Sequence, residues 1–176
     1  MIKFRLLFVA AAAVLISACA ASGPKVRTDR DPLADLGSYK TFGFFEQLPG
    51  DRARYSSVMS NRLRAATIAE LTKRGYTYDA RMPQLRVNLF LQVANRQDVR
   101  STPGAGRPWL GMRDIDTVGY KAGTLRIDLV DVVRNASVWQ AVAEGKIPEE
   151  AMKDPGPAVD AVVRSMFQQF PDKPQA

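Results

Sequence analysis

The sequence contains no histidine. Histidine is the usual general base near neutral pH and the commonest protein metal ligand, so its absence excludes serine–histidine–aspartate and cysteine–histidine triads. Cys19 is the single cysteine, which leaves no partner for an intrachain disulfide and no set of thiolates for zinc. We therefore expect no catalytic residue, no metal site and no cofactor. Chemistry based on carboxylates, lysine or tyrosine remains open.

The chain also lacks an apolar run long enough to cross a membrane. Leu6–Ile16 is an apolar run of eleven residues, well short of the roughly 20 that a transmembrane helix needs. Behind Lys3 and Arg5 it is typical of a signal-peptide core. The run ends in Ile16-Ser-Ala-Cys19, which resembles a lipobox and implies cleavage before Cys19 and lipid attachment there. The alternative is an ordinary secretory signal cut at an A-x-A-like site within Ala18–Ala20.

The lipobox interpretation divides the chain into four parts. We expect a lipoprotein signal peptide at 1–18, a lipidated flexible tether at 19–32, a single α+β periplasmic domain at 33–171 and a polar tail at 172–176. Two or three acyl chains would hold the protein firmly on a bilayer, where one chain anchors only marginally. Ala20 stands where an aspartate would favour retention in the inner membrane, so we expect the outer membrane, with the domain facing the periplasm.

The charge balance is basic but spread out. The net charge is +7, and loss of Lys3 and Arg5 with the signal peptide leaves +5 (25 − 2 − 18). A modest positive charge suits a protein beside anionic envelope surfaces. Because no basic run is interleaved with aromatic residues, we expect no nucleic-acid partner.

Hydrophobic periodicity predicts the element order β-α-β-β-β-α. Period-2 alternation is clearest in 85–93 and also marks strands at 123–132 and 137–144, with an aromatic-rich strand at 39–45. Helical spacing marks 54–74, ended by Gly75, and a last helix that starts at Asp154–Pro157 and stops at Pro171. The order predicts a two-layer α+β sandwich, an antiparallel sheet of about four strands with two helices on one face.

Residues 95–119 do not fit this pattern, since they separate two strands by far more than a hairpin requires. A loop this long is usually functional or disordered. It contains a candidate partner-contact patch of three apolar residues rimmed by two arginines: Trp109, Leu110, Met112, Arg107 and Arg113. The alternative is that Trp109 folds back onto the sheet. Asp114 and Asp116 in the same segment are interpreted as solvated.

Asp128 and Asp131 are the most suggestive acidic pair. Three positions apart in a strand, they point to opposite faces of the sheet, which disfavours a shared acid–base site. We expect Asp128 to pair with Arg126 or a neighbouring strand. Asn88, on the wetter face of its strand, is expected to make a cross-strand hydrogen bond.

Five segments together resemble the bacterial lipoproteins grouped as domain-of-unknown-function family 4136. They are Leu36–Phe42, Leu71–Tyr76, Pro83–Asn88, Gly123–Asp131 and Val138–Ala143, followed by Phe170-Pro171. The resemblance implies an envelope lipoprotein with an α+β domain and supplies no activity. Gln84 departs from the family pattern, which often has an aspartate after the proline.

These observations favour a non-enzymatic, membrane-anchored lipoprotein that binds or supports another envelope component. Two alternatives stay open. One is a lipid or solute transport accessory protein with an apolar ligand cavity between sheet and helices. The other is an envelope-polymer hydrolase that uses a carboxylate pair about 5–9.5 Å apart.

Overall fold

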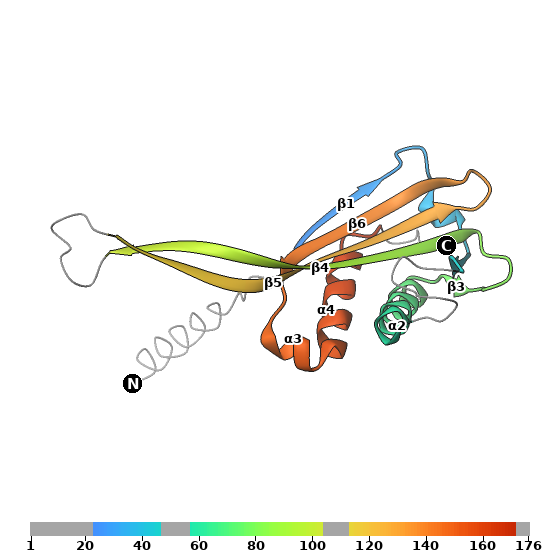
Figure 1. Ribbon diagram of the computed structural model, residues 1–176. Helices are drawn as coiled ribbons and strands as arrows, with labels where there is room; N and C mark the ends of the chain where they lie inside the picture. Colours follow the sequence, from blue (N-terminus) through green and yellow to red (C-terminus); the bar gives the residue numbers. More distant parts are fainter. Residues whose placement is uncertain (1–22, 47–56, 104–112, 172–176) are drawn as a thin grey trace, which may run out of the picture.

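The computed structural model describes residues 23–46, 57–103 and 113–171. Within these ranges the chain forms a six-stranded sheet with helices against one face (Figure 1). The strands are β1 (Lys25–Arg30), β2 (Thr41–Phe44), β3 (Thr77–Tyr78), β4 (Leu85–Pro103), β5 (Arg113–Asp131) and β6 (Ala136–Lys146). The helical elements are the 3₁₀ turn η1 (Leu36–Ser38) and the helices α2 (Val58–Lys73), α3 (Glu149–Lys153) and α4 (Pro155–Phe167).

The sheet is mixed, with strand order β1-β6-β5-β4-β2-β3. β1, β6, β5 and β4 are antiparallel neighbours, whereas β2 runs parallel to both β4 and β3. The chain leaves β2, passes through α2 and the short strand β3, and then enters β4. Such a crossover returns the chain to the same end of the sheet and so makes the strands parallel. The α+β class is confirmed, but an antiparallel sheet of about four strands was wrong.

The two additional strands are β1 and β3. Residues 25–30 were expected in the flexible tether 19–32, yet they pair with β6 from Lys25↔Glu144 to Arg30↔Trp139. β1 is an edge strand whose charged residues alternate with half-buried ones, and edge strands commonly carry charge. Because this composition resembles that of a polar linker, the sequence pattern did not indicate a strand at residues 25–30. β3 has two residues, too few to show a period.

The start and end of α2 follow from local chemistry. Ser57 accepts a hydrogen bond from the Ser60 amide at 3.0 Å and so caps the helix start. Gly75 has φ 80°, the left-handed conformation that ends a helix at low cost in glycine. The Tyr76 amide then bonds to the Leu71 carbonyl at 3.1 Å. The predicted end of this helix at Gly75 is confirmed.

The core lies between the sheet and the helices α2 and α4. Its centre is an aromatic cluster in which the Trp139 ring lies 5.2 Å from Phe167 and 5.0 Å from Phe170, centroid to centroid. Tyr76 is buried nearby and donates its hydroxyl hydrogen to the Leu36 carbonyl at 2.7 Å. Tyr76 and Trp139 are thus core residues, while Tyr78 is 44% exposed.

Candidate functional site: a protruding β-arm

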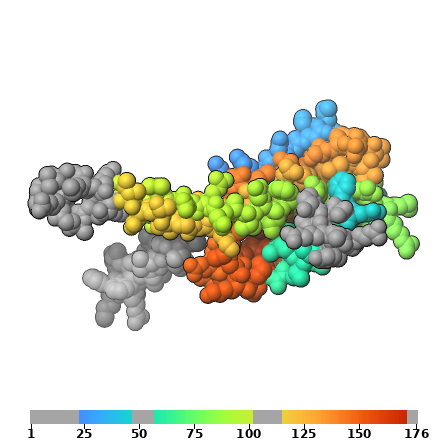
Figure 2. Space-filling view, viewed as in Figure 1, coloured from blue at the N-terminus to red at the C-terminus, as the bar shows by residue number. Residues whose placement is uncertain are grey.

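Strands β4 and β5 continue well past the end of β6. β6 ends at Lys146, which pairs with Ala122, whereas β4 and β5 stay paired from Asn95↔Lys121 to Pro103↔Arg113. We call residues 95–103 and 113–121 the β-arm. At about 3.3 Å per residue, its nine paired positions extend about 30 Å. Figures 1 and 2 show a narrow green and yellow projection from the body of the protein.

The β-arm corrects the prediction of a long loop at 95–119. Residues 95–103 and 113–119 are strand, and only 104–112 lie outside the described residues. A ribbon with water on both faces has no buried side. Its sequence therefore needs no alternation of apolar and polar residues, and the period-2 signal that marks Leu85–Val93 is lost.

The structure does not test the predicted partner-contact patch. Four of its members lie outside the described residues: Arg107, Trp109, Leu110 and Met112. The fifth, Arg113, is the first residue of β5 and pairs with Pro103. Cys19, the predicted lipid attachment site, also lies outside the described residues.

The base of the arm is locked to the end of β6. The Lys146 ammonium lies 2.6 Å from Oδ2 of Asp98 and 4.1 Å from the centroid of the Tyr120 ring. Beyond it, the Ile147 amide donates to the Lys121 carbonyl at 2.8 Å. The hydrogen bond from Lys146 lowers the pKa of Asp98 below its ordinary value. These contacts hold the ribbon where the third strand ends.

The two faces of the arm differ in chemistry. Directly paired residues share a face of the sheet. The face of the sheet that packs against the helices can therefore be followed along β4 from Leu91 into the arm, and we call this side of the arm the inner face. Its exposed apolar residues are Val99 (69%) and Ile115 (72%) within the arm, and Leu91 (36%) and Val93 (52%) in β4 just before the arm begins. The charged residues Arg96, Asp98, Arg100 and Asp116 lie on the opposite, outer face. Among the described side chains, the outer face of the arm has one exposed apolar residue, Val118 (45%).

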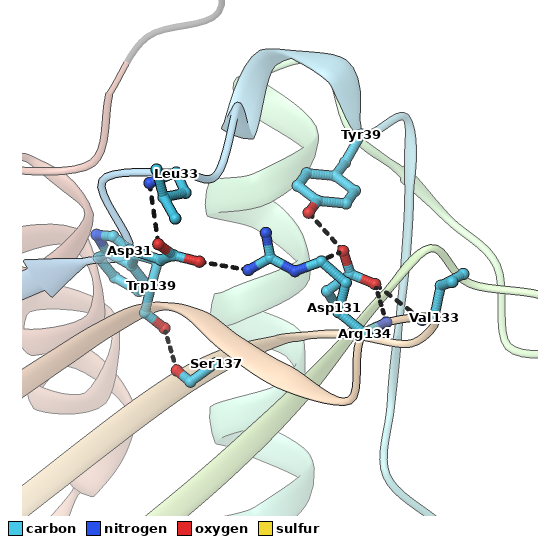
Figure 3. A network of polar contacts seen from close by, with 8 residues as sticks. All are labelled: Asp31, Leu33, Tyr39, Asp131, Val133, Arg134, Ser137 and Trp139. Atoms are coloured by element: carbon cyan, nitrogen blue, oxygen red, sulfur yellow. Dashed lines mark hydrogen bonds and ion pairs between the residues drawn. The ribbon is translucent and has the colours of Figure 1, made fainter.

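A polar network joins the N-terminal segment to the turn between β5 and β6 (Figure 3). Oδ1 of Asp131 accepts from the amides of Val133 at 2.8 Å and Arg134 at 2.9 Å, and Oδ2 accepts from the Tyr39 hydroxyl at 2.7 Å. The Arg134 guanidinium also forms an ion pair with Asp31. Both oxygens of Asp131 are engaged, so this carboxylate serves as an acceptor that closes the turn.

The network changes the acidity of its members in opposite directions. The Arg134 amide and the Tyr39 hydroxyl lower the pKa of Asp131 below its ordinary value. Burial and the hydrogen bond to Asp131 raise the pKa of Tyr39 to about 12. Near neutral pH the tyrosine therefore stays protonated and the aspartate stays charged, which suits a fixed structural contact.

Asp128 lies in a separate network on the sheet face opposite the helices. It accepts from Asn88 Nδ2 at 3.2 Å and from Gln140 Nε2 at 2.8 Å, and Arg126 Nε lies 3.3 Å from its Oδ2. The predicted pairing of Asp128 with Arg126 and the cross-strand role of Asn88 are confirmed. Asp128 and Asp131 have no shared partner among these contacts, in keeping with the predicted opposite faces.

The described residues contain no cluster of three or more histidine, cysteine, aspartate or glutamate side chains that could hold a metal ion. Among the same residues, no helix is both long and apolar enough to span a bilayer.

Comparison with known proteins places the chain in a family. Residues 26–172 match the family described as "Domain of unknown function (DUF4136)". The chain belongs to the DUF4136 family. The predicted resemblance is therefore confirmed over nearly all of the described domain. No curated protein matches the chain.

Solved structures share the fold at low sequence identity. A DUF4136 family protein from Bacteroides thetaiotaomicron is 14% identical with a TM-score of 0.54, over 84% of this chain and 95% of that one. A PDZ domain protein from Parabacteroides distasonis is 16% identical with a TM-score of 0.57, over 85% of this chain. This chain spans 36% of that larger protein. The DUF4136 fold is thus found both as nearly a whole chain and as part of a longer one.

Sequence reasoning missed the residues that build the arm. Asp98, Tyr120 and Lys146 lie far apart in the sequence, and only the pairing register brings them together. Val93 and Val99 share the odd-numbered face of the buried Leu85, Val87 and Leu89. The polar residues Asn95 and Gln97 lie between them on that face, so the alternation gives no signal along the arm.

Proposed function

We propose that this DUF4136 chain is a lipoprotein held on the outer membrane through Cys19, with its domain in the periplasm. We further propose that it is a non-enzymatic binding or structural component of the cell envelope. The observation that carries the binding role is the β-arm. An isolated two-stranded ribbon is at best marginally stable in water, and this one contributes none of the buried hydrophobic residues of the core. Contact with a partner explains why the chain maintains it.

The state of the carboxylates supports a non-enzymatic role. A hydrolase of envelope polymers needs two carboxylates that face one cleft. The two buried aspartates, Asp128 and Asp131, instead bind separate sets of donors. Each carboxylate is used as a hydrogen-bond acceptor within the sheet or its turn, which supports a structural role for both.

The anchor is tested by Cys19→Ser. We expect the wild-type protein to remain with the membrane fraction after a salt wash and the variant to be released. Intact-mass measurement of the wild-type protein should show a chain that begins at Cys19 and carries acyl groups. A membrane-bound Cys19→Ser variant, or a wild-type chain with a free thiol, contradicts the anchor.

The binding role is tested by shortening the arm. Replacing residues 99–117 by Asn-Gly joins Asp98 to Val118, which are already paired, through a sequence that favours a two-residue hairpin turn. The contact between Asp98 and Lys146 is retained. We expect an unchanged thermal unfolding midpoint and loss of the partners captured by in-cell crosslinking of the wild-type chain. Unchanged crosslinks in a folded short-arm variant contradict a contact role for the arm.

A further inference from the structure

We propose that the inner face of the β-arm lies against the surface of the bilayer in which Cys19 is anchored. This inference rests on the proposed lipid anchor. To that anchor, the inference adds an orientation of the domain and a second contact with the lipid.

The first argument is where the tether meets the domain. A Cβ placed on Gly145 would lie 3.1 Å from Cα of Pro24. Gly145, Gly123 and Val93 form one row across the sheet, with pairs Gly123↔Gly145 and Val93↔Gly123. Val93 belongs to the inner face, so Cβ atoms in this row point to that side. Pro24 therefore lies on the inner side of the sheet, in the row where the exposed apolar residues of the arm begin.

The second argument is the length of the tether. Pro24 follows Cys19 by five positions, and five extended residues reach at most about 18 Å. Since β1 already starts at Lys25, the rest of the expected tether adds no reach. Acyl chains on Cys19 thus bring the bilayer surface within about 18 Å of Pro24, which lies on the inner side of the sheet in the row next to the base of the arm.

The third argument is the composition of the face itself. Val93, Val99 and Ile115 are all more than half exposed, and exposed apolar residues gathered on one face indicate a contact surface. The pairing register places a single charged residue on this face within residues 91–101 and 115–121. That residue is the cation Lys121. The acidic side chains Asp98 and Asp116 lie on the outer face. The other side chains of this face in the arm are uncharged and polar: Asn95, Gln97, Ser101 and Thr117. A face with exposed apolar residues, a cation and no carboxylate within these ranges is complementary to an anionic bilayer surface.

The fourth argument is that the described helices leave this face open. In Figure 1, α2, α3 and α4 lie under the body of the sheet and the arm projects beyond them. The inner face of the arm therefore continues the sheet face that packs against the helices, but no described helix covers it there. The bilayer supplies that layer when the domain sits close to its anchor.

The test uses the acylated full chain with one introduced cysteine, because acylation of Cys19 leaves the new thiol as the one reactive site. Val99→Cys places an environment-sensitive fluorophore on the inner face. Arg100→Cys, the next residue, places it on the outer face and is the matched control, since both positions are exposed. The labelled proteins are reconstituted on vesicles of phosphatidylethanolamine and phosphatidylglycerol. Flotation, emission maximum and quenching by a lipid-attached quencher are then measured.

We expect both proteins to float with the vesicles, and the label at position 99 to show a blue-shifted emission and severalfold more lipid quenching than the label at position 100. Equal quenching at the two positions on floating protein overturns the bilayer contact and leaves the anchor intact. A blue shift at position 99 that grows with protein concentration and resists the lipid quencher assigns the face to a second copy of the chain and also overturns it. Protein that does not float contradicts the anchor itself, and with it the contact.

Discussion

The hydroxyl of Tyr39 donates a hydrogen bond to Oδ2 of Asp131 at 2.7 Å, although the two residues are 92 positions apart in the chain. Tyr39 lies two residues before Thr41, the first residue of β2, and Asp131 is the last residue of β5. The bond therefore joins the segment before the parallel strand to the end of a central antiparallel strand. The same carboxylate closes the turn into β6, so one side chain fixes three parts of the fold.

We predict that Asp131→Ala destabilises the protein more than Tyr39→Phe. Removing Asp131 leaves two amides and a hydroxyl without their acceptor, and hydrogen bonds to charged groups contribute about 1.5–3 kcal/mol. Tyr39→Phe removes one such bond of the three and should cost about 1.5–3 kcal/mol, less than the loss of all three. Urea denaturation of each single variant and of the double variant measures both effects. Additive costs would show that the two side chains are not coupled.

The lowered pKa of Asp131 predicts a dependence of stability on pH. In the unfolded chain this carboxyl takes up its proton near its ordinary pKa of about 3.9, whereas the folded protein holds it ionised to lower pH. Its contribution is therefore present above pH about 4 and is lost as the pH falls through the folded value. Asp131→Asn should be less stable than wild type at pH 7, and the difference should shrink in acid. A difference that stays constant down to low pH contradicts this account.

We predict that Arg74 clamps the two long helices together. Its guanidinium donates to the Phe167 carbonyl at 2.6 Å, at the end of α4, and to Oε2 of Glu70 at 2.8 Å, in α2. Burial alone would raise the pKa of Glu70, but hydrogen bonds from Lys73 and Arg74 lower it. Arg74→Ala should cost about 1.5–3 kcal/mol of unfolding free energy. Lys73→Ala is the matched control, because that side chain is 61% exposed and should cost under about 1 kcal/mol.

Gly43 is predicted to tolerate no side chain. A Cβ at this buried position would lie 2.6 Å from the Asp79 carbonyl oxygen and 3.1 Å from Pro83. Gly43→Ala should therefore lower the free energy of unfolding by about 1–3 kcal/mol. Gly119→Ala, in the β-arm, is the control, since nothing lies within 4 Å of its Cβ position. Equal stability of the two variants would mean that the loop at Asp79 moves away freely.

Gln84 is predicted to hold the start of β2 against β4. Its Oε1 accepts from the amides of Lys40 at 2.6 Å and Thr41 at 3.2 Å. Gln84→Ala should speed hydrogen exchange of these two amides, whereas Gln84→Asp, the residue type expected from the family resemblance, retains an acceptor on a side chain one methylene shorter and should keep more of the protection. Mass spectrometry of exchange at residues 40–41 compares both variants with the wild type. Wild-type protection in Gln84→Ala would show that the side chain is not needed.

The sequence predicts those parts of the fold where one face is buried and the other is wet. Leu85–Val93 and Leu125–Leu129 alternate for that reason, and the capping chemistry at Gly75 marks the end of a helix. The β-arm lacks this asymmetry because both of its faces are exposed. The parallel placement of β2 depends on the crossover through α2, which strand patterns alone do not encode.

In the candidate site, too, the sequence predicts local contacts but not the contacts that depend on strand register. The local partners of Asp128 follow from its place in a strand, since Arg126 is two residues away on the same face. The contact of Lys146 with Asp98 depends on the register between three strands, and a shift of one residue would move each side chain to the other face. The apolar inner face becomes visible only once that register is known.

The position of β1 has a consequence for the order of folding. Among the described strands β1 comes first, yet its neighbour in the sheet is β6, which begins at Ala136. Most of the polypeptide must therefore be available at the site of folding before β1 can find its partner, and closing so large a loop is entropically slow. The domain of an exported chain thus stays incompletely folded until its last quarter has crossed the membrane.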